Sequence, residues 1–327
     1  MNPRLLTATL LALAGLVRLS AAAVSEPKLF TGMCNASAVV MLDERHFAVA
    51  NDEDSRLRIY DLQQPGPPLA APDFAAFLKL APKQPETDLE AAARVGDLVF
   101  WLTSHGRNTD GKERPNRRRL FAARLTNRNG QPVLEPVGQP CRTLLEEMLA
   151  EPCLARLGLA AAMQPAARPP RTVEIEGLAA TPQGGLLVGF RSPIRGREAF
   201  VVPLENPREV IAGERARFGD PLLLGLGGRG IRDFVLVGTN YFILAGPTNG
   251  GGSFRLYTWP GGDAPAKHIK SVSFAGLHPE AITPLLPGDA TRLLVLSDDG
   301  KYQIDGCPCG ELTDPARRRF RAVVVTP

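Results

Sequence analysis

The sequence predicts an all-β fold, a β-propeller of about five blades, with six blades as the alternative and a short helical insertion around residues 141–170. Three observations favour this class. A short motif recurs about every 50 residues along the 327-residue chain. Each copy is followed by an apolar run at the distance expected of a β-hairpin. The chain also contains 32 Gly and 30 Pro, a composition that favours many turns over a few long helices.

The repeated motif is five residues long, and three of its copies have glutamate in the third position. The copies are Asn35–Val39, Asp88–Ala92, Glu174–Leu178, the degenerate Gly230–Phe234, and His278–Ile282. Self-similarity at a regular period is the main sequence sign of a repeat architecture, so the five copies predict five structural units.

The spacing within each copy predicts its geometry. In four copies the third motif residue lies fourteen positions before the end of the apolar run, as from Glu90 to Ser104 and from Glu176 to Phe190. Two strands of about six residues and a two-residue turn account for that interval. Because a hairpin returns to the edge where it began, we expect the motif residue and the following loop to share one face of the fold.

The intervals between copies, 53, 86, 57 and 47 residues, fit propeller blades of several strands each. The long second interval is explained by about 30 residues of helical excursion. We expect the apolar run at residues 320–325 to complete a blade that the N-terminal strand begins, which would close the ring. A two-sheet β-sandwich is the structural alternative.

The helical insertion is predicted from the spacing of Leu144, Leu145, Met148 and Leu149, which marks one face of a short helix. Cys141 and Cys153 flank this helix and would staple it if they were bridged. A second bridge from Cys34 to Cys307 or Cys309 would tie the chain ends together. The sequence fixes neither pairing, and an odd count of 5 cysteines leaves at least one thiol over.

The first 23 residues have the features of a secretory signal peptide: Arg4, an apolar run from Leu5 to Val17, and the small residues 20–23. We expect residues 24–327 to form a single β-propeller domain in the periplasm or outside the cell. No later stretch is apolar enough for a transmembrane helix. The formal net charge of +4 falls further when Arg4 and Arg18 are removed, which argues against a nucleic-acid partner.

Several motifs, in the same order, resemble a secreted bacterial family of unknown function, the domain-of-unknown-function family numbered three thousand six hundred and sixteen. They span nearly all of the predicted mature chain and are Cys34–Ser37, Asn51–Asp54, Asp88–Glu90, Ser104–Asn108, Glu174–Leu178, Gly189–Pro193 and His278–Ala281. The resemblance implies a propeller-like β fold and, more loosely, similarity to phytase-like esterase propellers. It implies no established activity. In this family the first motif typically reads Cys-Asp-Ala-Ser, and Asn35 stands here in place of the acid.

The motif predicts a ring of charged side chains at one mouth of the central channel, because residues two apart on a strand share a face. Asp88 with Glu90, Glu174 with Glu176, and His278 with Glu280 should point the same way. Ser37 and Arg232 should complete the ring, and the hairpin spacing adds Asp52, Arg191 and Asp298. Three clustered carboxylates suit a hard cation such as Ca²⁺, so the candidate metal ligands are Asp88, Glu90, Glu176 and Glu280.

The basic residues near this ring give the remaining candidates. Arg107, Arg191, Arg232 and His278 are predicted to bind a ligand, since arginines clamp phosphate or carboxylate groups well. Alternatively, Arg232 neutralises the neighbouring glutamates and the ring only fixes the blades. His105 is the candidate acid–base residue, because it occurs in one loop rather than in every copy.

Two functions of different class remain open from the sequence. The favoured one is a propeller that binds a small molecule or a periplasmic protein on the channel-mouth face. The alternative is a Ca²⁺-assisted ester or phosphoester hydrolase of phytase-like type. The sequence shows no Gly-x-Ser-x-Gly elbow and no His-Glu-x-x-His motif that would support a catalytic reading directly.

Overall fold

The computed structural model describes residues 23–81, 86–108, 110–164, 172–249, 251–286, 289 and 291–327. Residues 1–22, which include nearly all of the predicted signal peptide, lie outside this range, as do residues 165–170 of the predicted insertion. Within the described chain, no helix is long and apolar enough to span a membrane.

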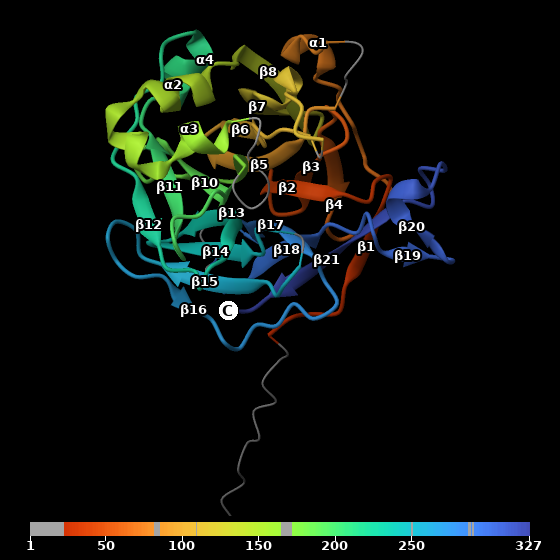
Figure 1. The fold of residues 1–327 in the computed structure, drawn as a ribbon. Coiled ribbons are helices and arrows are strands. Elements are labelled where there is room, and N and C mark those ends of the chain that lie inside the picture. Colours follow the sequence, from red (N-terminus) through yellow and green to blue (C-terminus); the bar gives the residue numbers. More distant parts are fainter. Residues whose placement is uncertain are drawn as a thin grey trace, which may run out of the picture.

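Five antiparallel sheets form the five blades of a β-propeller, as the repeat predicted (Figure 1). Blade 1 contains β2 (Ala36–Met41), β3 (His46–Asn51) and β4 (Arg58–Asp61). Blade 2 contains β5 (Leu89–Val95), β6 (Leu98–Thr103), β7 (Leu120–Arg128) and β8 (Gln131–Cys141). Blade 3 contains β9 (Glu174–Ala180), β10 (Leu186–Ser192), β11 (Ala199–Leu204) and β12 (Leu222–Leu224).

Blade 4 contains β13 (Gly230–Val237), β14 (Asn240–Gly246), β15 (Arg255–Trp259) and β16 (Lys267–His268). Blade 5 contains β17 (Pro279–Pro284), β18 (Leu293–Ser297), β21 (Arg319–Val325) and β1 (Lys28–Thr31). The first strands β2, β5, β9, β13 and β17 pack each against the next, and β17 returns to β2. They form the inner ring, and each blade continues outward from it.

Both chain ends close the ring, as predicted. The N-terminal strand β1 pairs with the C-terminal strand β21, which in turn pairs with β18 of the same blade. Phe30 of β1 is fully buried, stacks on Phe320 of β21, and meets Phe47 and Tyr60 of blade 1 edge-on. Blade 5 is therefore held both by main-chain pairing and by an aromatic cluster.

The core lies between the blades rather than inside any one of them. Five clusters of buried apolar side chains each join two neighbouring blades around the ring. Both faces of every blade are thereby buried. This explains why the strands are apolar runs without strict alternation of apolar and polar residues.

The helical insertion follows β8 and consists of α2 (Leu144–Ala150), the 3₁₀ helix Pro152–Leu157 and α3 (Leu159–Ala162). Of the predicted helix face, Leu144, Leu145 and Met148 are buried, whereas Leu149 is exposed. These helices cover blades 2 and 3 through a shared apolar cluster.

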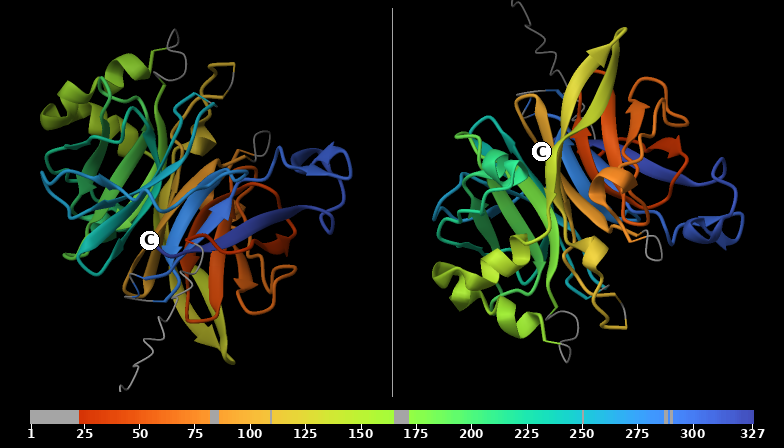
Figure 2. Two further views of the ribbon diagram at one scale, coloured as in Figure 1. Left: turned by 90° about the horizontal axis from the view of Figure 1, so that it is seen from below. Right: turned by 90° about the horizontal axis from the view of Figure 1, so that it is seen from above.

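Short elements fill the remaining connections. They are α1 (Ala75–Leu78), the 3₁₀ helices Pro115–Arg117 and Cys309–Glu311, α4 (Pro207–Ala212), and the hairpin of β19 (Gln303–Ile304) and β20 (Cys307–Pro308). The β7–β8 hairpin is longer than the rest of its blade and projects from the ring in Figure 2, where it is yellow.

A disulfide joins Cys34 to Cys309 and ties the two ends of the chain across 275 residues. It realises one of the two end-to-end pairings that the sequence left open. Cys141, Cys153 and Cys307 are free thiols, so no bridge staples the helical insertion. The insertion is held instead by its buried leucines.

Candidate functional site

Each blade has a β-bulge at the third residue of the repeated motif. In blade 2, Leu89 pairs with Thr103 and Ala91 with Leu102, so that Glu90 between them has no cross-strand partner. The equivalent register shifts leave Ser37, Glu176, Arg232 and Glu280 unpaired in the other blades. A bulge bends its strand and redirects the extra side chain, and bulges often lie next to functional sites.

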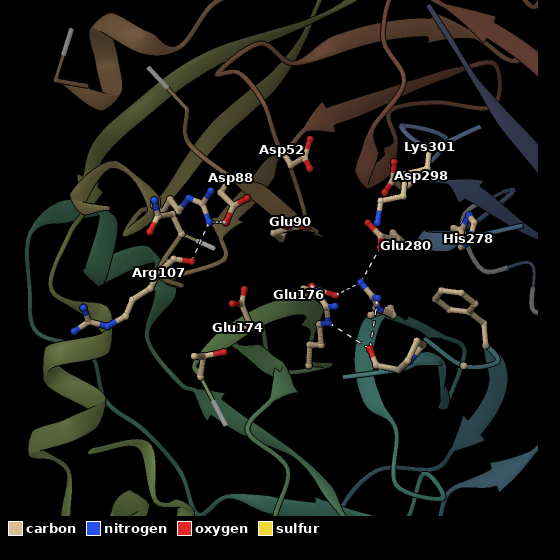
Figure 3. A pocket seen from close by; sticks show the side chains of 18 of the residues that line it. Asp52, Asp88, Glu90, Arg107, Glu174, Glu176, His278, Glu280, Asp298 and Lys301 are labelled. Carbon is tan, nitrogen blue, oxygen red and sulfur yellow. Dashed lines mark hydrogen bonds and ion pairs between the residues drawn. The ribbon is translucent and has the colours of Figure 1, made fainter. Parts of the chain in front are cut away.

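Because all five bulges lie at the start of the inner strands, they are at the same mouth of the ring. A cavity of about 530 Å³ opens there (Figure 3). Its charged lining residues are Asp52, Asp88, Glu90, Arg107, Arg117, Glu174, Glu176, Arg191, Arg232, His278, Glu280, Asp298 and Lys301. The structure thus brings together every candidate site residue except His105, and also the Asp52 and Asp298 expected from the hairpin spacing.

Ser37 differs from the other four bulged residues. It is buried, and its hydroxyl donates to the carbonyl oxygens of Leu89 and Ala50. Its side chain therefore links blades 1 and 2, and blade 1 contributes Asp52 to the cavity instead.

Arg232 clamps two of the predicted metal ligands. Its Nη1 donates to Glu176 Oε2 at 2.9 Å and to Glu280 Oε1 at 2.7 Å, which joins blades 3, 4 and 5. Arg191 Nη1 donates to Glu176 Oε1 at 2.7 Å. Both Arg232 and Glu176 are almost completely buried. These carboxylates therefore already have cationic partners in the structure.

Asp88 is bound in a similar way on blade 2. Arg117 Nη1 lies 2.9 Å from Asp88 Oδ2, and the Ser104 hydroxyl donates to the same oxygen. Burial nevertheless raises the pKa of Asp88 to about 6, since the opposing effects of Arg117 and Ser104 only partly offset it. Asp88 also has a left-handed backbone with φ 56°, a conformation that is uncommon for a residue other than Gly and that clusters at functional sites.

Glu90 and Glu174 line the cavity without any such partner. Among the described residues, neither side chain makes a hydrogen bond or an ion pair. Burial raises the pKa of Glu90 well above its usual range, and the charges of Asp88 and Glu176 add to the effect. Burial, Asp88 and Glu176 also raise the pKa of Glu174 to about 8. Two carboxyl groups from neighbouring blades therefore face the cavity without a direct hydrogen-bond or ion-pair partner among the described residues.

The pKa values of the Asp52 and Glu280 carboxyl groups are raised as well. Burial, followed by the charges of Asp298 and Asp88, raises the pKa of Asp52 well above its usual range. Burial raises the pKa of Glu280 to about 8 even though Arg232 opposes the shift. The cavity thus has more buried acid than its cations neutralise, and the acids repel one another.

Over the residues that the structure describes, no group of three or more His, Cys, Asp or Glu side chains is arranged to hold a metal ion. The predicted ligands lie around one cavity, but Glu176 and Glu280 are bound to Arg232 and Asp88 to Arg117. A bound Ca²⁺ would have to displace these arginines.

His105 does not line the cavity. Its side chain is buried, and its Nδ1 donates to the Thr103 carbonyl oxygen at 2.8 Å. Burial lowers the pKa of His105 to about 4, so the imidazole is neutral at physiological pH. Like Asp88, it has a left-handed backbone, with φ 56°. In this position His105 supports the loop that carries Arg107 and does not reach the lumen.

Arg107 lies at the rim, and its guanidinium is engaged outside the lumen. It donates to the carbonyl oxygens of Gly111 and Met163 and to Glu113 Oε1. This residue therefore links the blade 2 loop to the end of α3. Figure 3 shows its side chain directed away from the central carboxylates.

Arg117, Glu174, Phe254 and Lys301 are among the lining residues that the sequence did not single out as site candidates. Glu174 follows the same two-residue spacing as Asp88, so the strand period could have identified it. Arg117 lies in a run of basic residues, a pattern that more often marks a solvated surface than a site. Phe254 and Lys301 lie in loops without a repeating pattern, and no sequence signal points to them.

Comparisons with known proteins give one family match and several similar solved structures. Residues 170–291 match the family described as Protein of unknown function (DUF3616). The DUF3616 match confirms the resemblance found in the sequence motifs. It extends from the start of blade 3 to the inner hairpin of blade 5, and it includes Glu174, Glu176, Arg191, Arg232 and Glu280. No curated protein matches the sequence.

Solved structures similar to this chain include several enzymes. Glutaminyl cyclase of Myxococcus xanthus has 12% identity and a TM-score of 0.47, with 93% of this chain and 97% of that one covered. Aldose sugar dehydrogenase of Streptomyces coelicolor has 9% identity and a TM-score of 0.41, with 91% and 98% covered. An exo-β-1,3-galactanase of Clostridium thermocellum has 7% identity and a TM-score of 0.48, with 91% and 62% covered. These likenesses concern the fold alone.

Proposed function

We propose that the channel-mouth cavity binds a small ligand that carries a cationic group, and that Glu90 and Glu174 hold this group. One observation carries the proposal: these two carboxyl groups face the cavity without a hydrogen bond or an ion pair among the described residues. Buried carboxylates are normally paired, because an unpaired charge is expensive to desolvate. A cationic ligand supplies the missing partner.

The size and shape of the site support a small-molecule ligand. A volume of about 530 Å³ lies within the range of known ligand pockets, which are concave and have a few convergent polar groups. The predicted signal peptide and the Cys34–Cys309 disulfide support a site of action in the periplasm or outside the cell.

The test is isothermal titration calorimetry of residues 24–327 with n-butylammonium chloride, and with n-butanol as the neutral probe. We expect n-butylammonium to bind at pH 8.5 and n-butanol not to bind. Affinity should fall as the pH is lowered from 8.5 toward 6, because protonation of Glu174, whose pKa is about 8, removes a charge that attracts the cation.

Glu90→Gln is the decisive variant, and Glu198→Gln at an exposed position is the matched control. Loss of one charge-assisted contact should weaken n-butylammonium binding about tenfold in Glu90→Gln. Equal affinity in wild type and Glu90→Gln would overturn the proposal, as would equal binding of n-butanol.

A Ca²⁺-assisted ester or phosphoester hydrolase is the second candidate function. The observation that favours it is the crowding of acids around Glu90, whose pKa is raised by the charges of Asp88, Glu176, Glu280 and Asp52. A divalent cation would relieve that repulsion, and Ca²⁺ would polarise an ester or phosphoester oxygen. In this candidate, Arg191 and Arg232 would move to the substrate anion when the metal takes their carboxylates.

The two candidates differ in their response to Ca²⁺. The hydrolase requires turnover of p-nitrophenyl acetate or p-nitrophenyl phosphate that EDTA abolishes and Ca²⁺ restores. Unchanged turnover in EDTA, or Ca²⁺ that neither binds nor raises the unfolding temperature, would eliminate it.

A further inference from the structure

We infer that the ligand carries two cationic groups, one held by Glu90 and Glu174 and the other held by Asp52 on the blade 1 side of the cavity. The chemical class is that of short α,ω-diamines, in which a methylene chain separates two ammonium groups. The inference rests on the proposed function, because it assigns the second end of the same ligand.

Asp52 is a third acid of the cavity without a cationic partner. It follows β3 of blade 1 and lines the cavity. Its Oδ1 atom is buried and has no hydrogen-bond partner among the described residues, and none of the ion pairs there includes this carboxylate. Burial raises the pKa of Asp52 well above its usual range, and the side-chain amide of Asn35 only partly offsets the rise. A buried carboxylate needs a positive charge, which a neutral amide does not supply.

Asp52 and Glu174 belong to blades that are not neighbours. The inner strands β2, β5 and β9 pack in that order, so blade 2 with Glu90 lies between blade 1 with Asp52 and blade 3 with Glu174. Figure 3 shows Asp52 and Glu174 on different sides of Glu90. The lumen therefore has two separate places where a cation can meet an unpaired carboxylate.

The two places also differ in the charges around them. After burial, Asp298 of blade 5 contributes most to the raised pKa of Asp52. For the raised pKa of Glu174, the corresponding charge is that of Asp88 in blade 2. A cation bound beside Glu174 therefore does not remove the main repulsion at Asp52, and a second cation is needed there.

The cations of the cavity do not supply this second charge. Arg117, Arg191 and Arg232 each form ion pairs with other lining acids. Arg107 points away from the central carboxylates. Lys301 lines the cavity but is exposed, and its ammonium forms no ion pair within the described chain. Water screens an exposed charge, so Lys301 neutralises a buried carboxylate poorly.

One flexible chain can serve both places, because all three unpaired acids line the same cavity of about 530 Å³. Once the first ammonium is bound, the second contact is made within one complex. A diamine therefore gains the second ion pair without the loss of translational freedom that a second ligand would incur. This favours a diamine over two separate monoamines.

The test compares each diamine with the amino alcohol of the same length, in which a hydroxyl group replaces one ammonium. The probes are 1,4-diaminobutane with 4-amino-1-butanol, and 1,6-diaminohexane with 6-amino-1-hexanol. Each is titrated into residues 24–327 at pH 8.5 by isothermal titration calorimetry. We expect at least one diamine to bind about tenfold more tightly than its amino alcohol, which is the contribution of one charge-assisted contact.

Asp52→Asn should reduce this preference to within about twofold. Asp263→Asn, at an exposed position between β15 and β16, is the matched control and should retain the preference. Equal affinity of the wild-type protein for both diamines and their amino alcohols would overturn the second cationic group and leave the proposed cation site standing. A full preference retained in Asp52→Asn would overturn it as well. Absence of binding by diamines and amino alcohols alike would overturn the cation site itself, and with it this inference.

Discussion

Glu174→Gln should stabilise the protein at pH 8 and leave its stability unchanged near pH 4.5. The pKa of Glu174 is raised from 4.5 to about 8, mainly by burial and then by the charges of Asp88 and Glu176. The folded state therefore binds the proton more tightly than the unfolded state does. The stability contributed by this group is complete below pH 4.5 and is lost as the pH rises through about 8.

The size of the effect follows from the interval between the two pKa values of Glu174, 4.5 in the unfolded state and about 8 in the folded state. Each pH unit between the two pKa values changes the free energy of unfolding by about 1.4 kcal/mol, so the whole window amounts to about 5 kcal/mol as an upper bound. Glutamine has nearly the same shape and no charge, so the Glu174→Gln variant does not lose this stability as the pH rises. Asp88 and Glu280, with pKa values of about 6 and about 8, leave the variant with a smaller slope of the same sign.

The assay is urea unfolding of wild type, Glu174→Gln and the control Glu198→Gln at steps of half a unit from pH 4.5 to 8.5. The difference between Glu174→Gln and wild type should grow from near zero to several kcal/mol, whereas Glu198→Gln should follow wild type. Parallel curves for Glu174→Gln and wild type would show that Glu174 is solvated, and the argument for an uncompensated acid pair would fail.

Three further predictions concern the framework around the site. Asp233 is buried and accepts hydrogen bonds from the N–H groups of Phe234 and Ile282, which joins blades 4 and 5. In urea titrations, Asp233→Ala should lower the free energy of unfolding by about 3 kcal/mol and Asp233→Asn by about 1 kcal/mol. Reduction of the Cys34–Cys309 disulfide by dithiothreitol should cost about 2–5 kcal/mol, and dithiothreitol should not change the stability of a variant with both cysteines replaced by Ala. Replacing the fully buried Phe30 with Ala should cost about 3–5 kcal/mol by differential scanning calorimetry, and a loss below about 1 kcal/mol would mean that β1 does not close the ring.

The architecture could be predicted from the sequence because a propeller is built from repeated blades, and each blade begins with a copy of the same motif. Five motif copies, four of them with the same hairpin spacing, predicted about five blades with six as the alternative, and the apolar run at residues 320–325 predicted the closing strand. The cysteine pairing could not be predicted: the sequence left open a Cys141–Cys153 bridge, which the structure does not form, and a bridge from Cys34 to either Cys307 or Cys309. Choosing between them depends on the turn after β20, for which the sequence offers no rule.

The pairing of charges in the site could not be predicted, because it depends on contacts between blades. Arg232 meets Glu176 and Glu280, which lie 56 and 48 residues away in sequence. The sequence predicted that these groups share a mouth, but not that the arginine lies between the two acids. His105 failed as a lumen residue for a similar reason, since the loop turns at its left-handed backbone and buries the ring.

The repeated motif serves both the fold and the site, because its third residue is a bulge in every blade. A bulged residue has no cross-strand partner, so its side chain can change without altering the ladder on either side. This accounts for Ser37, Glu90, Glu176, Arg232 and Glu280 occupying equivalent positions with different chemistry. The apolar residues that follow each bulge must stay apolar, because they fill the clusters between the blades. Ligand preference in such a propeller can therefore be changed most freely at Glu90, because Ser37 and the Arg232–Glu176–Glu280 group also link neighbouring blades.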